Sequence, residues 1–384
     1  MKVVLLTNMI PPYRVEFFRE LSHICDLTVV CDSLTSPLRE WKQDPKDFGF
    51  TYLELGEEGV VYTHERPDAG FDEQRIRHKG KGVIKVLKSM QPDIVITCEF
   101  GMRSLYTYWY SLRQSVPYII WSEGTRYTEK AVRGTRKAMR QFLARRASGF
   151  WTNGTASRNY LEDIGAKSDT ISEGMTGIST HTYRDAGLHL ASERVQLRSD
   201  YKIEGACLLF VGAISERKGV IQLMKAIEQC DSQLTKQATF IIAGSGPLQE
   251  EAEDLQSRLS SINLVFPGFQ NEEGIQKLFA ASDVFVMPTL DDNWPLVTIE
   301  AMVSGLPQIG SIYNGASEDL AQKKEVGVFI DPHDSDRLAE VLLNGFENPP
   351  ARLSRSVVEW ATEYYSPREQ AKRALEIIRR VGQN

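Results

Sequence analysis

The sequence predicts an α/β protein with two halves, each built on a parallel β-sheet whose strands are joined by helices. Three observations lead to this prediction. The chain has 384 residues, more than one ordinary core of about 150 residues holds. Short apolar runs alternate with helical patterns along most of the chain. The polar segment 174–201 has no clear apolar period and separates two such series.

The first series begins with a strand–helix–strand unit at the N-terminus. The expected strands are residues 2–7, 27–30, 93–97, 117–121 and 149–152, and the expected helices are residues 15–21, 82–90 and 104–113. The strand candidates are continuous apolar runs. Such runs are typical of parallel strands that helices cover on both faces.

The second series repeats this pattern after the polar segment. The expected strands are residues 207–212, 240–244, 264–266 and 284–287, and the expected helices are residues 219–229, 247–257 and 296–304. Helical spacing in the tail is broken at Pro367. We therefore expect an N-terminal domain at 1–178, a linker at 179–204, a C-terminal domain at 205–360 and a final helical segment at 361–384.

Composition excludes several classes of protein. The formal net charge of −6 argues against general nucleic-acid binding. Five scattered cysteines without a CxxC pair predict a reducing compartment and no zinc site. The first apolar run is too short for a signal peptide, and no run approaches the length of a membrane span. These features predict a cytoplasmic protein.

Several short motifs follow one another at regular spacing in the second half. They are residues 210–212, 216–219, 242–247, 266–269, 281–288, 292–302, 305–307 and 314–318. In this order they resemble the retaining glycosyltransferases of the group-one family (family four). The resemblance is strong from Leu208 to Phe329 and weaker, but consistent, over the first 175 residues.

The resemblance implies the GT-B fold, in which two Rossmann-like domains face each other across a cleft. The N-terminal domain is then expected to bind the acceptor and the C-terminal domain the nucleotide sugar, with the final helix returning to the N-terminal domain. The implied enzyme moves a hexose-type sugar, with UDP-sugar favoured, to a hydroxyl of a glycan, lipid-linked or small-molecule acceptor. Such a reaction belongs to polysaccharide or glycoconjugate biosynthesis, retains anomeric configuration, and needs no metal or other cofactor.

The chemistry of a nucleotide-diphosphate leaving group singles out one loop and one helix start. Lys218 and Arg217 follow an expected strand, where open α/β sheets bind ligands, and two cations there can stabilise the diphosphate. Pro295 suits the first helical position, so the amides of Leu296 and Val297 can bind phosphate.

The resemblance assigns further roles. It implies that Glu300 binds the donor ribose, that Asp292 holds donor-sugar hydroxyls, and that Gly246 and Phe269 lie near the base, with Gly212 in the first turn of the domain. Asp292 stands where the family has Glu. Ala213 stands where the family commonly has Arg, and the sequence leaves open whether Arg217 replaces that cation.

The N-terminal domain departs further from the family pattern. Pro12, Tyr13 and Arg14 occupy the first strand-to-helix loop, where many members have glycines. Glu123 stands where many members have a histidine near the reacting carbon. We hypothesise that Glu123 contacts the donor sugar or the acceptor, and the alternative is that it caps a helix. With Asp292, Lys218 and Glu300 it completes the expected catalytic set.

Other interpretations stay open. Asp291 and Asp292 could form a metal-binding pair, although their spacing differs from DxD. Residues 130–146 form a basic amphipathic pattern that suits either a solvated surface helix or peripheral contact with anionic membrane at the inner face; Lys79, Lys81, Lys85 and Lys88 add cations. A sugar-nucleotide epimerase, a phosphorylase and a catalytically degenerate binding protein are the rival functions.

Overall fold

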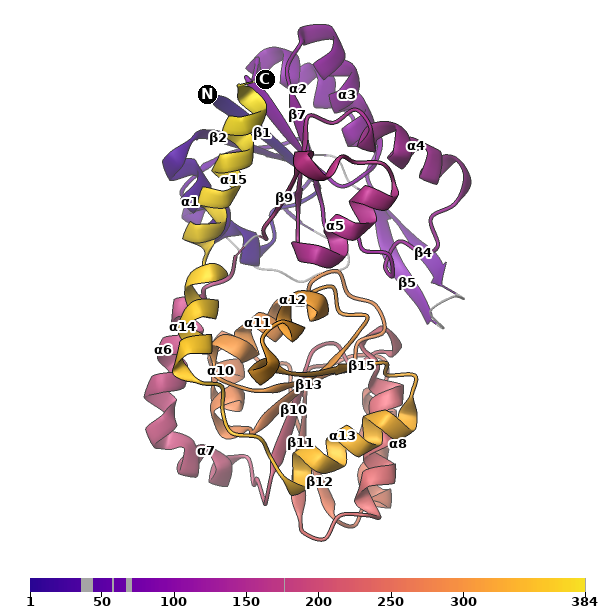
Figure 1. Ribbon diagram of the computed structural model, residues 1–384, viewed down its shortest axis with the longest axis vertical. Coiled ribbons are helices and arrows are strands. Elements are labelled where there is room, and N and C mark those ends of the chain that lie inside the picture. Colours follow the sequence, from indigo (N-terminus) through magenta and orange to yellow (C-terminus); the bar gives the residue numbers. More distant parts are fainter. Residues whose placement is uncertain (36–43, 57–58, 67–70, 176, 384) are drawn as a thin grey trace. The chain divides into compact units, whose positions relative to one another are not determined.

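A computed structural model describes residues 1–35, 44–56, 59–66, 71–175 and 177–383. The chain forms two compact units (Figure 1). Unit 1 contains Met1–Ile178 and Tyr365–Asn384, and unit 2 contains Ser179–Tyr364. Both units are parallel-sheet α/β domains, which confirms the predicted fold class.

Unit 1 contains a seven-stranded parallel sheet with the order β3-β2-β1-β6-β7-β8-β9. The strands are β1 (Lys2–Thr7), β2 (Asp26–Cys31), β3 (Thr51–Glu54), β6 (Ile94–Cys98), β7 (Tyr118–Ser122), β8 (Gly149–Thr152) and β9 (Ile171–Glu173). A separate antiparallel hairpin joins β4 (Val60–Arg66) to β5 (Phe71–Arg77). The strand order reverses between β1 and β6, the position at which open α/β sheets bind ligands.

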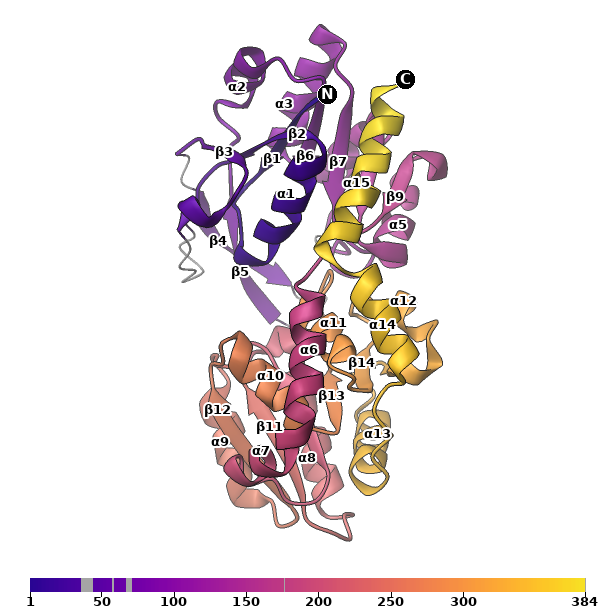
Figure 2. The same cartoon turned by 90° about the vertical axis from the view of Figure 1, so that its left-hand side faces the viewer.

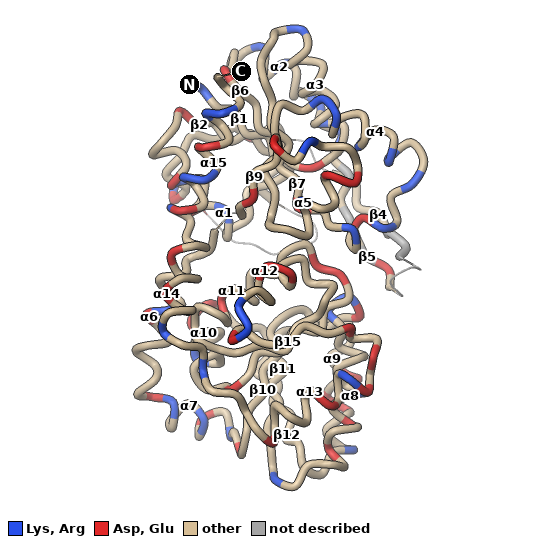
Figure 3. The backbone as a smooth tube through the Cα atoms, in the orientation of Figure 1, with Lys and Arg blue, Asp and Glu red and all other residues tan. Residues whose placement is uncertain are grey.

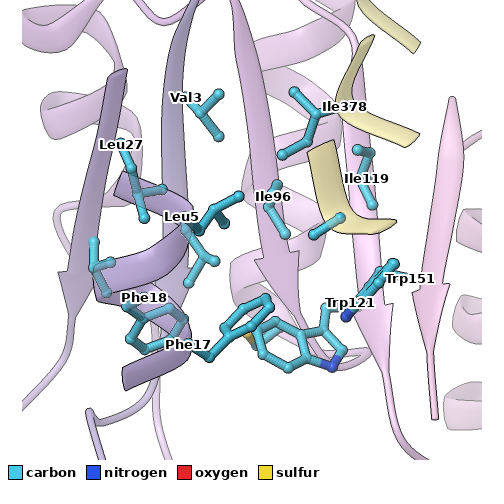
Figure 4. Close-up of a cluster of buried hydrophobic side chains, with 14 of the residues drawn as sticks. Val3, Leu5, Phe17, Phe18, Leu27, Ile96, Ile119, Trp121, Trp151 and Ile378 are labelled. Atoms are coloured by element: carbon cyan, nitrogen blue, oxygen red, sulfur yellow. The ribbon is translucent and has the colours of Figure 1, made fainter. Parts of the chain in front are cut away.

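Helices cover both faces of this sheet. On one face lie α1 (Pro12–Ile24) and α15 (Pro367–Gly382), which pack against each other (Figure 2). The other face carries α2 (Val83–Met90), α3 (Met102–Gln114), α4 (Gly134–Ala144) and α5 (Gly154–Asp163). Phe17, Phe18, Trp121, Trp151 and Ile378 form much of the core under α1 and α15 (Figure 4). The end of the chain thus helps to build the core of unit 1.

Unit 2 contains a six-stranded parallel sheet with the order β12-β11-β10-β13-β14-β15. The strands are β10 (Cys207–Val211), β11 (Ala238–Ala243), β12 (Ile262–Gly268), β13 (Val284–Met287), β14 (Gln308–Ser311) and β15 (Gly327–Ile330). The helices are α6 (Thr180–Leu190), α7 (Arg194–Asp200), α8 (Val220–Asp231), α9 (Gln249–Leu255), α10 (Glu272–Ala281), α11 (Leu296–Val303), α12 (Ser317–Ala321), α13 (Ser335–Glu347) and α14 (Arg355–Tyr364). Here the order reverses between β10 and β13.

The expected linker at 179–204 is wrong, because α6 and α7 fold onto unit 2. Arg194 Nη2 lies 2.6 Å from Asp283 Oδ1, and Arg198 donates to the Ala281 carbonyl at 3.0 Å. Arg352, from the chain before α14, donates to the Phe279 carbonyl at 2.7 Å. These arginines bind carbonyls at the end of α10, which a helix leaves without internal partners. Arg194 and Arg198 are thus part of the packing of this segment onto unit 2.

Three expected strands have the observed bounds, namely β1, β8 and β13. The sequence patterns missed the hairpin β4–β5 and the short strands β3, β9, β14 and β15. Pro367 begins α15, because a proline is tolerated in the first turn of a helix. Every helix in the described part of the chain is too short or too polar to span a bilayer.

Candidate active site

Two loops of unit 2 meet where its strand order reverses. Lys218 ends the short 3₁₀ turn Glu216–Lys218 after β10, and Asp292 follows β13. Lys218 Nζ lies 2.5 Å from Asp292 Oδ2. Arg217 Nη1 lies 3.5 Å from the same oxygen and donates to the Asp291 carbonyl at 2.9 Å. The structure thus brings together three residues that the sequence singled out.

The backbone holds Asp292 in place. Its carbonyl accepts the Gly315 amide at 2.9 Å, and its Oδ1 accepts the Trp294 amide at 3.3 Å. Burial alone would raise the pKa of Asp292, but Lys218, Arg217 and the Trp294 amide together lower it. Asp292 is therefore ionised at neutral pH, and its charge is balanced by two cations.

Two glycines allow the loops around this cluster to approach closely. Gly219 has φ +75°, and a Cβ there would lie 1.9 Å from the Pro288 carbonyl oxygen. A Cβ on Gly246 would lie 2.3 Å from the Ile214 carbonyl oxygen. Gly212 donates its amide to Ala243 at the same strand ends. Gly246 therefore has a packing role here, whatever ligand it also faces.

Helix α11 begins next to the cluster, with Pro295 as the residue before its first turn. The amides of Leu296 and Val297 lie in that first turn, where a helix offers N–H groups to an anion. Glu300 lies one turn further and is partly buried. Burial and the charge of Glu272 raise the pKa of Glu300 to about 7, although a hydrogen bond with Tyr183 opposes the shift.

Two aromatic residues bear on this site. The sequence analysis singled out Phe269 but not Tyr183. Tyr183 is buried on α6, within the expected linker, and the sequence analysis missed its contact with Glu300. Phe269 follows β12 and is 82% exposed. Its side chain is thus accessible to a ligand.

The candidate residues of unit 1 form a separate cluster at the ends of β1, β6 and β7. Arg14 Nη2 lies 2.7 Å from Glu123 Oε1, and its guanidinium lies 4.6 Å from the centre of the Trp121 ring. The Glu123 carbonyl accepts a hydrogen bond from Ser157 at 2.9 Å. Pro12, Tyr13 and Arg14 do not lie in the expected loop but form the first turn of α1, because a proline is tolerated there. Pro12 and Tyr13 are exposed. The ion pair and the aromatic contact fix both charged side chains.

Glu99 belongs to this cluster, although the sequence analysis did not single it out. It directly follows β6 with φ +63°, an uncommon backbone conformation for a residue other than glycine. Its Oε1 accepts the Glu123 amide at 3.0 Å. Although the residue as a whole is exposed, desolvation of its carboxyl and the charges of Glu123 and Glu129 raise the pKa of Glu99 to about 7. Its position at the carboxyl end of a predicted strand was the signal that could have found it.

The predicted amphipathic helix exists as α4, but its apolar side packs into its own domain. Leu143 is fully buried, and Met139 and Phe142 pack against the same core. Arg140 Nη1 lies 2.7 Å from Glu129 Oε2 and donates to the Tyr160 hydroxyl at 2.6 Å. The apolar side of α4 is thus not available to lipid, because the fold uses it internally.

The described residues contain no group of three His, Cys, Asp or Glu side chains arranged to hold a metal ion. At Asp292 the neighbouring charge is already the ammonium of Lys218. The interpretation of Asp291 and Asp292 as a metal-binding pair therefore gains no support from their geometry.

Comparison with known proteins shows which proteins this chain is similar to. Residues 196–360 match the family model "Glycosyl transferases group 1". An uncharacterized glycosyltransferase of Methanocaldococcus jannaschii is 34% identical over 134 residues, which cover 34% of this chain and 33% of that protein. An α-1,4-N-acetyl-D-galactosaminyltransferase of Campylobacter jejuni is 25% identical over 151 residues, covering 39% of this chain and 41% of that protein.

These matches span about a third to two fifths of the length of the two relatives. Structural similarity covers more of the chain than sequence similarity does. The crystal structure of Anabaena HepE in complex with UDP has a TM-score of 0.73 at 17% sequence identity, and covers 99% of this chain and 100% of that chain. Residues 196–360 are therefore similar to the glycosyl transferases group 1 family, in a chain that has the two-domain GT-B fold.

Proposed function

We propose that this chain is a glycosyltransferase that moves a hexose-type sugar from a nucleotide-diphosphate donor to a hydroxyl of an acceptor. The convergence of Lys218, Arg217 and Asp292 between β10 and β13 carries this proposal. An ammonium has three donors, so Lys218 can hold Asp292 and a phosphate oxygen together. Arg217 supplies the second cation for the diphosphate leaving group, in place of the cation absent at Ala213.

The donor would occupy unit 2 along this strand edge. The amides of Leu296 and Val297 would bind phosphate, Glu300 the ribose hydroxyls, and Asp292 the hydroxyls of the sugar. Gly246 and Phe269 would lie near the base. Structures of Anabaena HepE that contain UDP or UDP-glucose favour a UDP-sugar as donor.

The acceptor would bind to unit 1, near Glu123 and Arg14. A glycan, a lipid-linked glycan and a small molecule all fit the proposal. The Campylobacter jejuni relative is named for an undecaprenol-linked glycan and a Streptomyces kanamyceticus relative for 2-deoxystreptamine. We propose retention of configuration, with a donor phosphate oxygen accepting the proton of the acceptor hydroxyl and with no metal or other cofactor.

Thermal melting with UDP, GDP, ADP, CMP and TDP, and then with the matching sugar nucleotides, tests the donor site. A ligand that binds only the folded protein raises Tm by mass action. We expect one base to raise Tm, and the rise to disappear in Lys218→Ala and Glu300→Ala. Lys225→Ala, which changes an exposed lysine on α8, should keep it. No rise with any nucleotide in the folded protein would refute the proposal.

Product analysis then separates the rival functions. A transferase consumes the donor at a rate that depends on the acceptor, whereas an epimerase changes the donor alone and a degenerate binding protein changes nothing. An NMR signal showing that the anomeric configuration of the product is opposite to that of the donor would contradict retention. Undiminished turnover after chelation with EDTA is expected for a reaction without a metal.

The ion pair between Arg14 and Glu123 requires a double-mutant cycle. Glu123→Gln alone removes a charge beside a partly buried guanidinium, so lost activity would have two explanations. If Glu123 contacts a substrate, Arg14→Met will not restore kcat/KM to the Glu123→Gln enzyme. Restored activity in the double variant would show that Glu123 only balances the charge of Arg14.

A further inference from the structure

We propose that the surface formed by α2, α3 and α4 of unit 1 docks onto an anionic lipid surface. We call it the docking face. Its helices and their loops lie within residues 79–92, 100–117 and 130–148, which contain thirteen lysines and arginines and no aspartate or glutamate. The whole chain has a net charge of −6. The positive charge is therefore concentrated on one part of an acidic protein (Figure 3).

Most of these cations are exposed. The two exceptions are Arg103, which pairs with the buried Asp32, and Arg140, which pairs with Glu129. The exposed ones are Lys79, Lys81, Lys85, Lys88, Arg113, Lys130, Arg133, Arg136, Lys137, Arg145 and Arg146. Because α3 packs against both α2 and α4, cations lie on both sides of it.

An apolar stripe runs along α3 between these cations. Met102 and Trp109 are each 42% exposed, and Leu112 is 60% exposed. They are separated by seven and three residues, which places them on one side of a helix. Arg113 lies 5.7 Å from the centre of the Trp109 ring. The apolar side of the docking face thus comes from α3, and not from α4 as the sequence pattern indicated.

This combination distinguishes lipid from other anionic partners. Cations next to a bilayer are attracted by anionic headgroups, and tryptophan and aliphatic side chains enter the interface. Nucleic acid would use the cations and could stack a base on Trp109, but it offers no site for Met102 and Leu112. The acids on the neighbouring helix α5 are already paired, Glu162 with Arg158 and Asp163 with Arg126.

Co-sedimentation of the full chain with vesicles tests the proposal. The vesicles are pure phosphatidylcholine, or phosphatidylcholine with about a third phosphatidylglycerol, a composition close to an anionic leaflet. We expect binding to the anionic vesicles alone. Each exposed cation near the surface is worth about a fivefold change in partition. The triple variant Lys85→Gln, Arg136→Gln, Lys137→Gln should therefore bind about a hundredfold more weakly.

Two further variants make the test specific. Lys225→Gln, Lys236→Gln, Lys324→Gln removes the same charge from exposed positions of unit 2 and should bind like the wild type. Trp109→Ser with Leu112→Ser should bind at least tenfold more weakly, with unchanged Tm as the check on folding. Vesicle binding is measured without any sugar donor. A negative result for membrane docking is therefore distinct from a negative result for the proposed transfer reaction.

Three results would overturn the proposal. They are absence of wild-type binding to anionic vesicles at low salt, equal weakening in the unit 2 control, and full binding by the α3 double variant. Binding of single-stranded DNA by the wild type, lost in the unit 1 triple variant and without any vesicle binding, would assign the face to nucleic acid instead.

Discussion

Changing Glu300 to glutamine tests the electrostatics of the proposed donor site most directly. Its pKa is raised to about 7 by burial and by Glu272. At pH 6 only about a tenth of the carboxyl is then ionised, and at pH 8 about nine tenths. Ribose hydroxyls donate hydrogen bonds best to the ionised form. Wild-type affinity for UDP should therefore rise about tenfold from pH 6 to pH 8 through this group.

Calorimetric titration of UDP at pH 6, 7 and 8 measures this rise. The diphosphate itself ionises in the same range, so the Glu300→Gln variant serves as the reference for that contribution. The ratio of wild-type to variant affinity should increase about tenfold. Parallel pH profiles for the two proteins would refute the assignment of Glu300 to the ribose, or its raised pKa.

The same shift predicts a stability effect with a definite sign. A carboxyl whose pKa is higher in the folded state stabilises the fold fully below its unfolded pKa near 4.5, and this contribution is lost as pH rises through about 7. The shift corresponds to at most about 3 kcal/mol. Without nucleotide, Glu300→Gln should thus unfold at higher denaturant concentration than the wild type at pH 8, and at a similar one at pH 5. A variant less stable than the wild type at pH 8 would contradict this reasoning.

Three other predictions concern Lys218 in the proposed donor site, Asp231 in unit 2 and Ile378 in unit 1. Lys218→Met should lower kcat/KM by about 10²–10³-fold, since it removes a charge at the leaving group, whereas Lys225→Met should leave it unchanged. Asp231, whose carboxylate accepts four hydrogen bonds before β12, has a lowered pKa although burial opposes it. Asp231→Ala should lower the free energy of unfolding by about 2–4 kcal/mol at pH 7 and by less as pH falls below 4, measured by urea denaturation. Ile378→Ala should lower the stability of unit 1 by about 2–5 kcal/mol in the same assay.

The parallel sheets could be predicted because most of their central strands are continuous apolar runs, with β14 (Gln308–Ser311) as an exception. β1, β8 and β13 are buried and show no competing pattern. The short edge strands could not be predicted in the same way. β15 has only four residues, none of them fully buried, and its pairing with β14 depends on the sheet that is already formed. The sequence carries little signal for such a strand.

Residues of the proposed donor site could be singled out from the sequence where they follow a strand or begin a helix. Lys218, Asp292 and Leu296 all do so, and the reversal of strand order brings the first two together. Charge pairing between distant segments could not be predicted. Glu123 is 109 positions from Arg14, and no local pattern links them.

The prediction of a linker at 179–204 was wrong for a reason that bears on function. The segment 179–204 is polar, and polar segments between two domains are usually linkers. Here its arginines bind Asp283 and the end of α10, which fixes α6 and with it Tyr183. Tyr183 in turn contacts Glu300, the residue we assign to the ribose. Folding of this segment therefore places Tyr183 against the carboxylate that we propose for the ribose, so a change at Arg194 should alter nucleotide affinity, measured by calorimetric titration of UDP.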